Sequence, residues 1–130
     1  LSRAAFKNML YFFKQCSETG VDLILDSNFR SEEVCDVADI AYEHGYNVVL
    51  LYLTADYEVL YERFLDRVAT RHRAHLSIGL QDNYQKFIDY IDYLRNQDLV
   101  FERNTIDITN LDKDAVLSEV VSLLKEHDIP

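Results

Sequence analysis

The residues best suited to chemistry are arginines that gather in one short stretch of an acidic chain. Arg63, Arg67, Arg71 and Arg73 fall within eleven residues, whereas the chain as a whole has a formal net charge of -10 at pH 7. Positive charge set against the overall balance predicts an anionic partner. Arg63 and Arg67 are four residues apart in a helix-patterned stretch, so both guanidinium groups can hold one anion, and phosphate is the leading candidate.

A plainer interpretation of the same stretch is a solvated helix face on which Glu62 and Asp66 screen the arginines. The position of the cluster favours a ligand, because the helical pattern gives way to an irregular segment at residues 70–79. Such a segment suits a lid that closes over phosphates, and we expect this lid at about residues 63–79. His72 and His75 have the spacing of a metal pair but no third ligand in register, so we interpret them as polar lid residues.

A second candidate site follows the apolar run Val21–Leu25, which predicts a buried strand. Asp26 ends this strand, and ligands of open α/β sheets bind at the carboxyl ends of strands. The Asp26 carboxylate could hold Mg²⁺ through water or accept a proton from a substrate hydroxyl. Asn28 and Arg30 come next and could bind the substrate. Alternatively, Asp26 and Asn28 only form a turn and Arg30 is solvated.

Hydrophobic periodicity predicts the elements that must position these residues. Their order is helix, strand, helix, strand, helix, helix, strand, helix, which implies parallel strands with right-handed crossovers in an α/β fold. We expect helices at about 5–19, 31–44, 57–69, 84–94 and 116–124, and strands at 21–26, 48–53 and 105–108.

Composition limits the class of protein. A chain of 130 residues that is 48% hydrophobic is expected to form a single domain, residues 1–130. No apolar run approaches the roughly 20 residues that span a bilayer, so we expect no membrane partner and a cytoplasmic location. The acidic pI of about 4.7 argues against a nucleic-acid partner. Cys16 and Cys35 are expected to be reduced thiols.

Together these features resemble the P-loop small-molecule kinases, and among them the predicted kinases of the AAA-like, zeta-toxin and gluconate-kinase neighbourhood. The resemblance rests on the strand ending Leu25-Asp26-Ser27-Asn28-Phe29, the strand leading through Thr54-Ala55-Asp56 into a helix with Arg63-x-x-x-Arg67, and Arg71-His72-x-x-His75. It extends over nearly the whole chain and implies a P-loop NTPase-like parallel sheet with flanking helices. It also implies ATP and Mg²⁺ as cofactors and transfer of the γ-phosphoryl to a hydroxyl of a small molecule.

The resemblance assigns roles to single residues. Arg63 would lie against the adenine, and Arg67 would reach the ATP phosphates. Arg71 and Arg73 would neutralise charge on the transferring phosphoryl group. Asp26 matches the acidic residue at the end of the family's third strand. Ala74 stands where relatives often have Gly.

One part of the family pattern is missing. No G-x-x-x-x-G-K-[ST] occurs, and the three glycines, Gly20, Gly45 and Gly79, form no phosphate loop. The chain therefore resembles the C-terminal two-thirds of a kinase, incomplete at its N-terminus. In the family, the strand before that loop lies between those that Val21–Asp26 and Val48–Leu53 resemble. We accordingly expect an N-terminal segment of the same protein, or a swapped partner, to complete the sheet.

Two other functions stay open. A degenerate kinase-like module could bind nucleotide weakly or serve as an interaction surface. A receiver-like phosphoacceptor domain would share the strand-end Asp26 and the Thr54-Ala55 pair, but Thr105–Asn110 has no lysine and the arginines would have no role. Tyr84, Tyr90 and Tyr93 could line a substrate pocket or belong to the core.

Overall fold

The computed structural model describes residues 2–72 and 79–129, and the chain divides into two compact units. The first unit consists of Leu1–Leu50 and Asn96–Arg103, and the second of Leu51–Arg95 and Asn104–Pro130. The segment Asn96–Arg103 thus belongs to the first unit, although the chain on both sides of it belongs to the second. A single domain over residues 1–130 stays a prediction.

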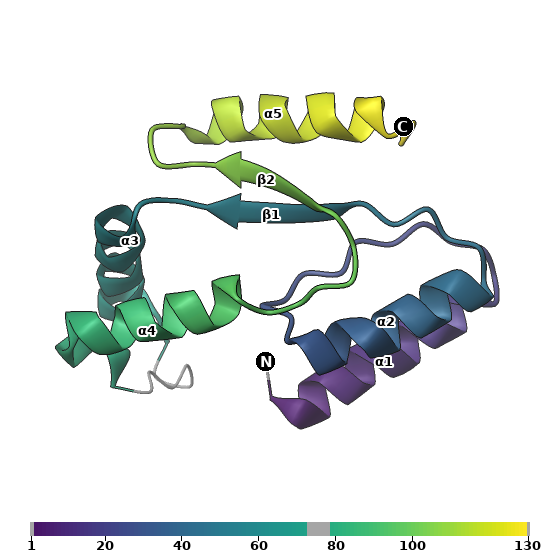
Figure 1. Ribbon diagram of the computed structural model, residues 1–130, viewed down its shortest axis with the longest axis horizontal. Coiled ribbons are helices and arrows are strands. Elements are labelled where there is room, and N and C mark those ends of the chain that lie inside the picture. Colours follow the sequence, from purple (N-terminus) through teal and green to yellow (C-terminus); the bar gives the residue numbers. More distant parts are fainter. Residues whose placement is uncertain (1, 73–78, 130) are drawn as a thin grey trace. The chain divides into compact units, whose positions relative to one another are not determined.

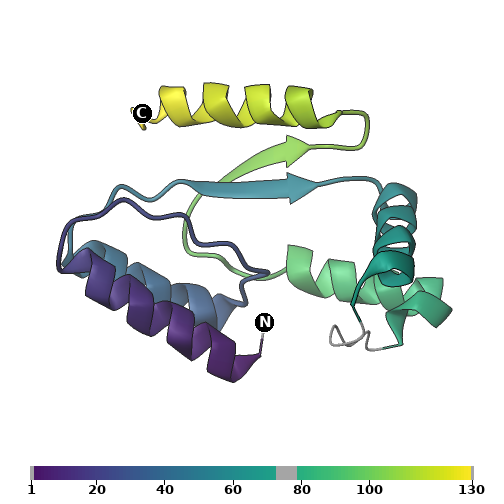
Figure 2. The same ribbon diagram turned by 180° about the vertical axis from the view of Figure 1, so that it is seen from behind.

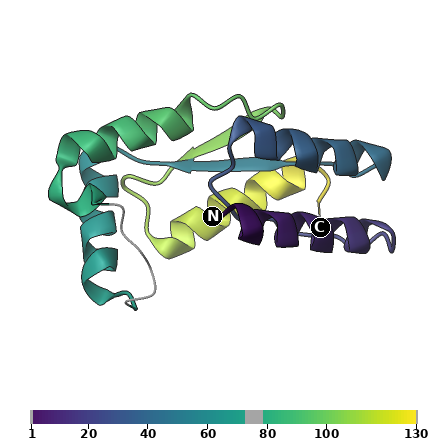
Figure 3. The same cartoon turned by 90° about the horizontal axis from the view of Figure 1, so that it is seen from below.

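Two helices, α1 (Arg3–Ser17) and α2 (Ser31–Glu43), form the first unit. They lie side by side and run in the same direction (Figures 1 and 3). Apolar residues at helical spacing face each other across the contact, which makes the core of this unit. Glycines with positive φ, Gly20 and Gly45, follow the two helices. The buried core residues are Phe6, Phe13, Val37 and Ala41.

The segment between these helices corrects one prediction. Val21–Asp26 is not a β-strand, and Ile24 is 94% exposed. Leu23 and Leu25 pack on the helical core while Ile24 between them is exposed, so these three residues alternate as in a strand. A ladder needs a neighbouring strand, and none of the described residues supplies one to this segment.

A two-stranded sheet with one helix along it begins the second unit. β1 (Leu50–Thr54) and β2 (Arg103–Asp107) are neighbours and run in parallel (Figure 1). α5 (Lys113–Glu126) lies along β2, also when seen from behind (Figure 2). The mixed α/β fold with parallel strands is therefore confirmed, with two strands where three were expected. Both strands begin two residues away from their predicted starts.

The remainder of the second unit consists of two helices with a short helix between them. The first helix is α3 (Tyr57–Thr70). After residues 73–78, which the structure does not describe, come the short helix η1 (Leu80–Asp82) and α4 (Tyr84–Arg95). The helices α3 and α4 cross at a steep angle (Figure 1), and we call this helix–η1–helix segment the α3–α4 hairpin. Phe87 is only 3% exposed and packs against the rings of Tyr61 and Phe64, with ring centroids 5.1 and 5.2 Å away. The Tyr61 hydroxyl donates to the Gln81 carbonyl at 2.8 Å. Aromatic packing therefore holds α3 against η1 and α4.

Candidate functional site at the carboxyl edge of the sheet

Arg63 on α3 reaches the turn between β2 and α5. Its Nη2 atom donates to the carbonyl oxygen of Ile108 at 3.2 Å. Ile108 is fixed in turn, because its amide donates to the carbonyl oxygen of Thr54 at 2.7 Å. The guanidinium group therefore lies at the carboxyl edge of both strands, where parallel sheets bind ligands.

The other predicted arginines follow along the same helix. Arg67 is exposed one turn after Arg63, as the helical spacing predicted. Arg71 is half-buried directly after α3, and its amide donates to the carbonyl of Arg67 at 2.9 Å. Arg73, together with Ala74 and His75, lies outside the described residues. The expected lid at residues 63–79 is thus described only in part, and its closure stays a prediction.

The predicted acidic site lies in the first unit, so its distance from the arginines is not defined. Asp26 and Asn28 are exposed in the segment that precedes α2. Arg30 comes next and its side chain has a specific partner: Nη2 and Nε donate to Glu33 Oε1 at 2.8 and 3.3 Å. This pairing shows that the Arg30 side chain is not simply solvated.

Glu33 organises the start of α2. Its second oxygen, Oε2, accepts from the amide of Arg30 at 3.0 Å, which satisfies a donor at the helix N-terminus. Burial acts to raise the pKa of Glu33, but the hydrogen bonds from Arg30 and its positive charge outweigh this effect and lower the pKa. Ser31 is the first residue of α2. Its hydroxyl donates to Gln97 Oε1 at 3.1 Å and accepts from the Asp98 amide at 3.0 Å.

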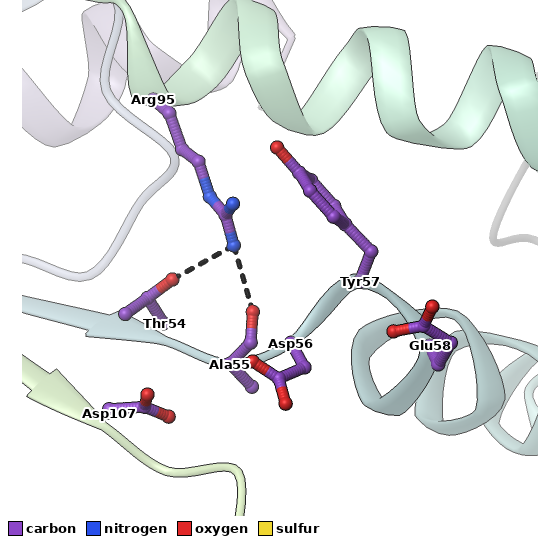
Figure 4. Close-up of a pocket in the computed structure, with 7 residues that line it drawn as sticks. All are labelled: Thr54, Ala55, Asp56, Tyr57, Glu58, Arg95 and Asp107. Atoms are coloured by element: carbon purple, nitrogen blue, oxygen red, sulfur yellow. Dashed lines mark hydrogen bonds between the residues drawn. The ribbon is translucent and has the colours of Figure 1, made fainter.

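A pocket of about 310 Å³ opens at the carboxyl end of β1. Arg95, the last residue of α4, supplies its basic group (Figure 4). Its Nη2 atom donates to the carbonyl of Ala55 at 2.8 Å and to the hydroxyl of Thr54 at 3.1 Å. The lining consists of Thr54, Ala55, Asp56, Tyr57, Glu58, Arg95 and Asp107.

Tyr57 and Asp92 extend the contacts of Arg95. The guanidinium carbon of Arg95 lies 4.4 Å from the centroid of the Tyr57 ring, within the range of a cation–π interaction. The Tyr57 hydroxyl donates to Asp92 Oδ1, one helical turn before Arg95. This bond to the Asp92 carboxylate, together with partial burial, raises the pKa of Tyr57 above its ordinary value.

The contacts among Tyr57, Asp92 and Arg95 were not predicted from the sequence. Arg95 looked like an ordinary basic residue in the last turn of a helix, where it complements the helix dipole. A usable signal was the pair Asp92 and Arg95 at i, i+3, which places a carboxylate and a guanidinium on one face of α4. Nothing in the sequence indicated that Tyr57, thirty-five residues before Asp92, would be their common partner.

The loop after β2 is fixed by a local network. Asp107 Oδ1 accepts from the Thr109 hydroxyl at 2.6 Å and from the Thr109 amide at 2.9 Å, and these bonds lower the pKa of Asp107. The Thr109 hydroxyl oxygen also accepts from the amide of Asp56 at 2.9 Å. The first residues of α3 and the loop that contacts Arg63 are therefore tied to each other.

Arginines on α3 present donors for phosphate oxygens. Among the residues that the structure describes, no group of three or more His, Cys, Asp or Glu side chains could enclose a metal ion. A single exposed carboxylate such as Asp26 suits magnesium held through water. No helix in the described part of the chain has the length and apolarity to cross a membrane.

Comparison with known proteins identifies the family. Residues 4–118 match the Zeta toxin family. No curated protein and no solved structure matches the chain. The matched region includes α1 to α4, both strands and the first part of α5, so it covers Asp26 and all four arginines. The chain therefore belongs to the Zeta toxin family, a family of P-loop kinase-like nucleotide-binding domains.

Proposed function

We propose that these residues are part of a longer ATP-dependent phosphotransferase that acts on a hydroxyl of a small molecule. The observation that carries this proposal is the position of Arg63, whose guanidinium group is 3.2 Å from the Ile108 carbonyl at the carboxyl edge of the sheet. Arg67 follows one turn later with an exposed side chain. A guanidinium group at this edge, with a second exposed one a helical turn further along α3, suits a nucleotide in a family of nucleotide-binding domains.

Each residue then has a distinct task. Arg63 stacks on the adenine and Arg67 binds the phosphates. Arg71 and Arg73 neutralise charge on the phosphoryl group as it is transferred. Asp26 accepts the proton of the acceptor hydroxyl or orients a water of Mg²⁺, and Asn28 and Arg30 bind the acceptor. The pairing of Arg30 with Glu33 supports this last role, because a held guanidinium loses less entropy on binding.

The kinase proposal requires a phosphate loop from outside these residues. Among the described residues, the segment Val21–Asp26 pairs with no strand and β1 pairs with β2 on one side. Both segments can accept a further strand, and we propose that an N-terminal segment of the same protein or a swapped partner supplies it. The absence of a G-x-x-x-x-G-K-[ST] sequence equally favours a second candidate, a degenerate module that binds nucleotide without catalysis.

Nucleotide binding separates these candidates. We would measure the affinity for labelled ATP of the 130-residue chain and of the natural protein that contains it. Tight binding and turnover by the natural protein alone would support the kinase, and weak binding without turnover by both would support the degenerate module. A receiver-like domain would instead take phosphoryl onto Asp26 from a small phosphodonor, and a match to the Zeta toxin family favours a kinase over it.

Arg67→Ala in the natural protein tests the site itself. Loss of one charge-assisted bond to phosphate, worth about 1.5–3 kcal/mol, should weaken ATP binding by roughly ten- to a hundredfold. Lys86→Ala is the matched control, since it removes an exposed positive charge from α4. Equal affinities of the Arg67 variant and the control would refute the assignment of Arg67.

A further inference from the structure

The chain leaves the sheet for the α3–α4 hairpin at the end of β1, and the side chain of the last residue of α4 contacts that same place. The chain departs from the end of β1 at Ala55 and Asp56, and α4 ends at Arg95. The side chain of Arg95 therefore lies where the last residue of the hairpin meets its first. In Figure 4 its guanidinium group reaches Thr54 and Ala55 and lies next to the ring of Tyr57.

Three kinds of contact join the two ends. Arg95 Nη2 donates to the Ala55 carbonyl at 2.8 Å and to the Thr54 hydroxyl at 3.1 Å. The Arg95 guanidinium carbon is 4.4 Å from the Tyr57 centroid, and the Tyr57 hydroxyl donates to Asp92. A planar guanidinium group can donate along its edge while its face stacks on a ring, whereas an ammonium group cannot do both.

These contacts fix the direction of α3 at its first turn. Arg67 is ten residues beyond Tyr57, which is about 15 Å along the helix axis at 1.5 Å per residue. If the axis of α3 tilted by about 10° about its first turn, Arg67 would move by about 2.6 Å, because the displacement grows with distance from the pivot. A shift of that size exceeds the tolerance of a hydrogen bond to a phosphate oxygen.

We propose that Arg95 is a positioning residue: by joining the two ends of the α3–α4 hairpin, it holds α3 in the orientation in which Arg63 and Arg67 meet a nucleotide. The part about nucleotide rests on the proposed function. The part about α3 stands on the contacts of Arg95 with Thr54, Ala55 and Tyr57.

Hydrogen exchange of the natural protein tests the part about α3. Arg95→Lys keeps the charge but loses the combination of stacking and paired donation, and should speed amide exchange in α3 by roughly five- to tenfold. Amides of α1 and α2 serve as an internal reference and should not change. Arg103→Lys is the matched control, because Arg103 lies on β2 and its guanidinium group also donates to a backbone carbonyl, that of Gln97 at 2.6 Å.

ATP affinity of the same variants tests the positioning role. Arg95→Lys should weaken ATP binding by about tenfold or more, and its effect should be smaller when Arg67 is already Ala, because part of the effect acts through that side chain. Tyr57→Leu removes the stacked ring and should reproduce both effects if the Arg95 variant folds poorly.

Each result has a distinct meaning. Unchanged exchange in α3 overturns the proposal, and so do faster exchange with normal ATP affinity and fully additive losses with Arg67→Ala. If the unsubstituted natural protein binds no ATP, the proposed function fails instead. Exchange in α3 then still decides whether Arg95 fixes the hairpin.

Discussion

Glu33→Gln removes the charge that holds Arg30 at the start of α2 and should destabilise the protein. Glu33 is 6% exposed and accepts three hydrogen bonds from Arg30, at 2.8, 3.0 and 3.3 Å. The glutamine side chain keeps one acceptor oxygen, but its NH₂ group replaces the other oxygen and cannot accept a hydrogen bond from Arg30. Hydrogen bonds to charged groups contribute about 1.5–3 kcal/mol each. Because the Arg30 side chain is 40% exposed, solvent screening reduces the expected loss to about 1–2 kcal/mol.

The effect must depend on pH in a defined direction. The pKa of Glu33 is lowered in the folded protein, so its contribution is fully present above the unfolded-state pKa of about 4.3. The contribution is then lost as the pH falls through the lowered folded-state pKa. Urea unfolding at pH 7 and at steps down to about pH 3 should therefore show a difference between the original protein and Glu33→Gln that shrinks toward acid.

Glu32→Gln provides the control for this experiment. Glu32 is in the same first turn of α2 but is exposed, so its loss changes the charge near the helix dipole without breaking a bond to Arg30. We expect an effect of about 0.3–0.5 kcal/mol from the dipole alone. Equal effects of the two substitutions, or a Glu33→Gln effect that persists unchanged to pH 3, would refute the role of the Arg30–Glu33 pair.

Two further predictions concern the second unit and the acidic site. Phe87→Ala should lower the free energy of unfolding by about 3–5 kcal/mol, because it removes the aromatic ring that packs between α3 and α4. Phe12→Ala, at a side chain that is 60% exposed, should lower it by well under half as much. Similar shifts of the melting temperature for both variants would contradict this packing. Asp26→Asn in the natural protein should lower turnover by roughly two orders of magnitude or more with little change in melting temperature; intact turnover with shifted melting would favour the turn-forming interpretation.

Helical periodicity predicted the helices well, because α1, α2 and α4 bury residues of their apolar stripes and the stripes of α3 and α5 are partly covered. α3 begins directly after Asp56, and its apolar residues face α4, as the spacing required. The glycines that end α1 and α2 were equally predictable, since both have positive φ. These features depend on local sequence alone.

The strand at Val21–Asp26 was not predictable from its own residues, because strand formation depends on the neighbouring strand. Leu23 and Leu25 do face the helical core, so the apolar pattern was correct for one face. The predicted burial of Ile24 was wrong, since nothing in the described chain covers it. The Arg95 site was missed for a related reason: its contacts with Thr54 and Tyr57 join residues about forty positions apart, which no local pattern encodes.

The division of the chain into two units has a practical consequence for dissection of the protein. Asn96–Arg103 belongs with α1 and α2, while α4 and β2 on either side of it belong to the other unit. The backbone therefore passes between the units three times, next to Leu50, Arg95 and Arg103. No single proteolytic cut or truncation can release either unit intact. Isolating the first would require a ligation of residue 50 to residue 96, and isolating the second a short linker in place of 96–103.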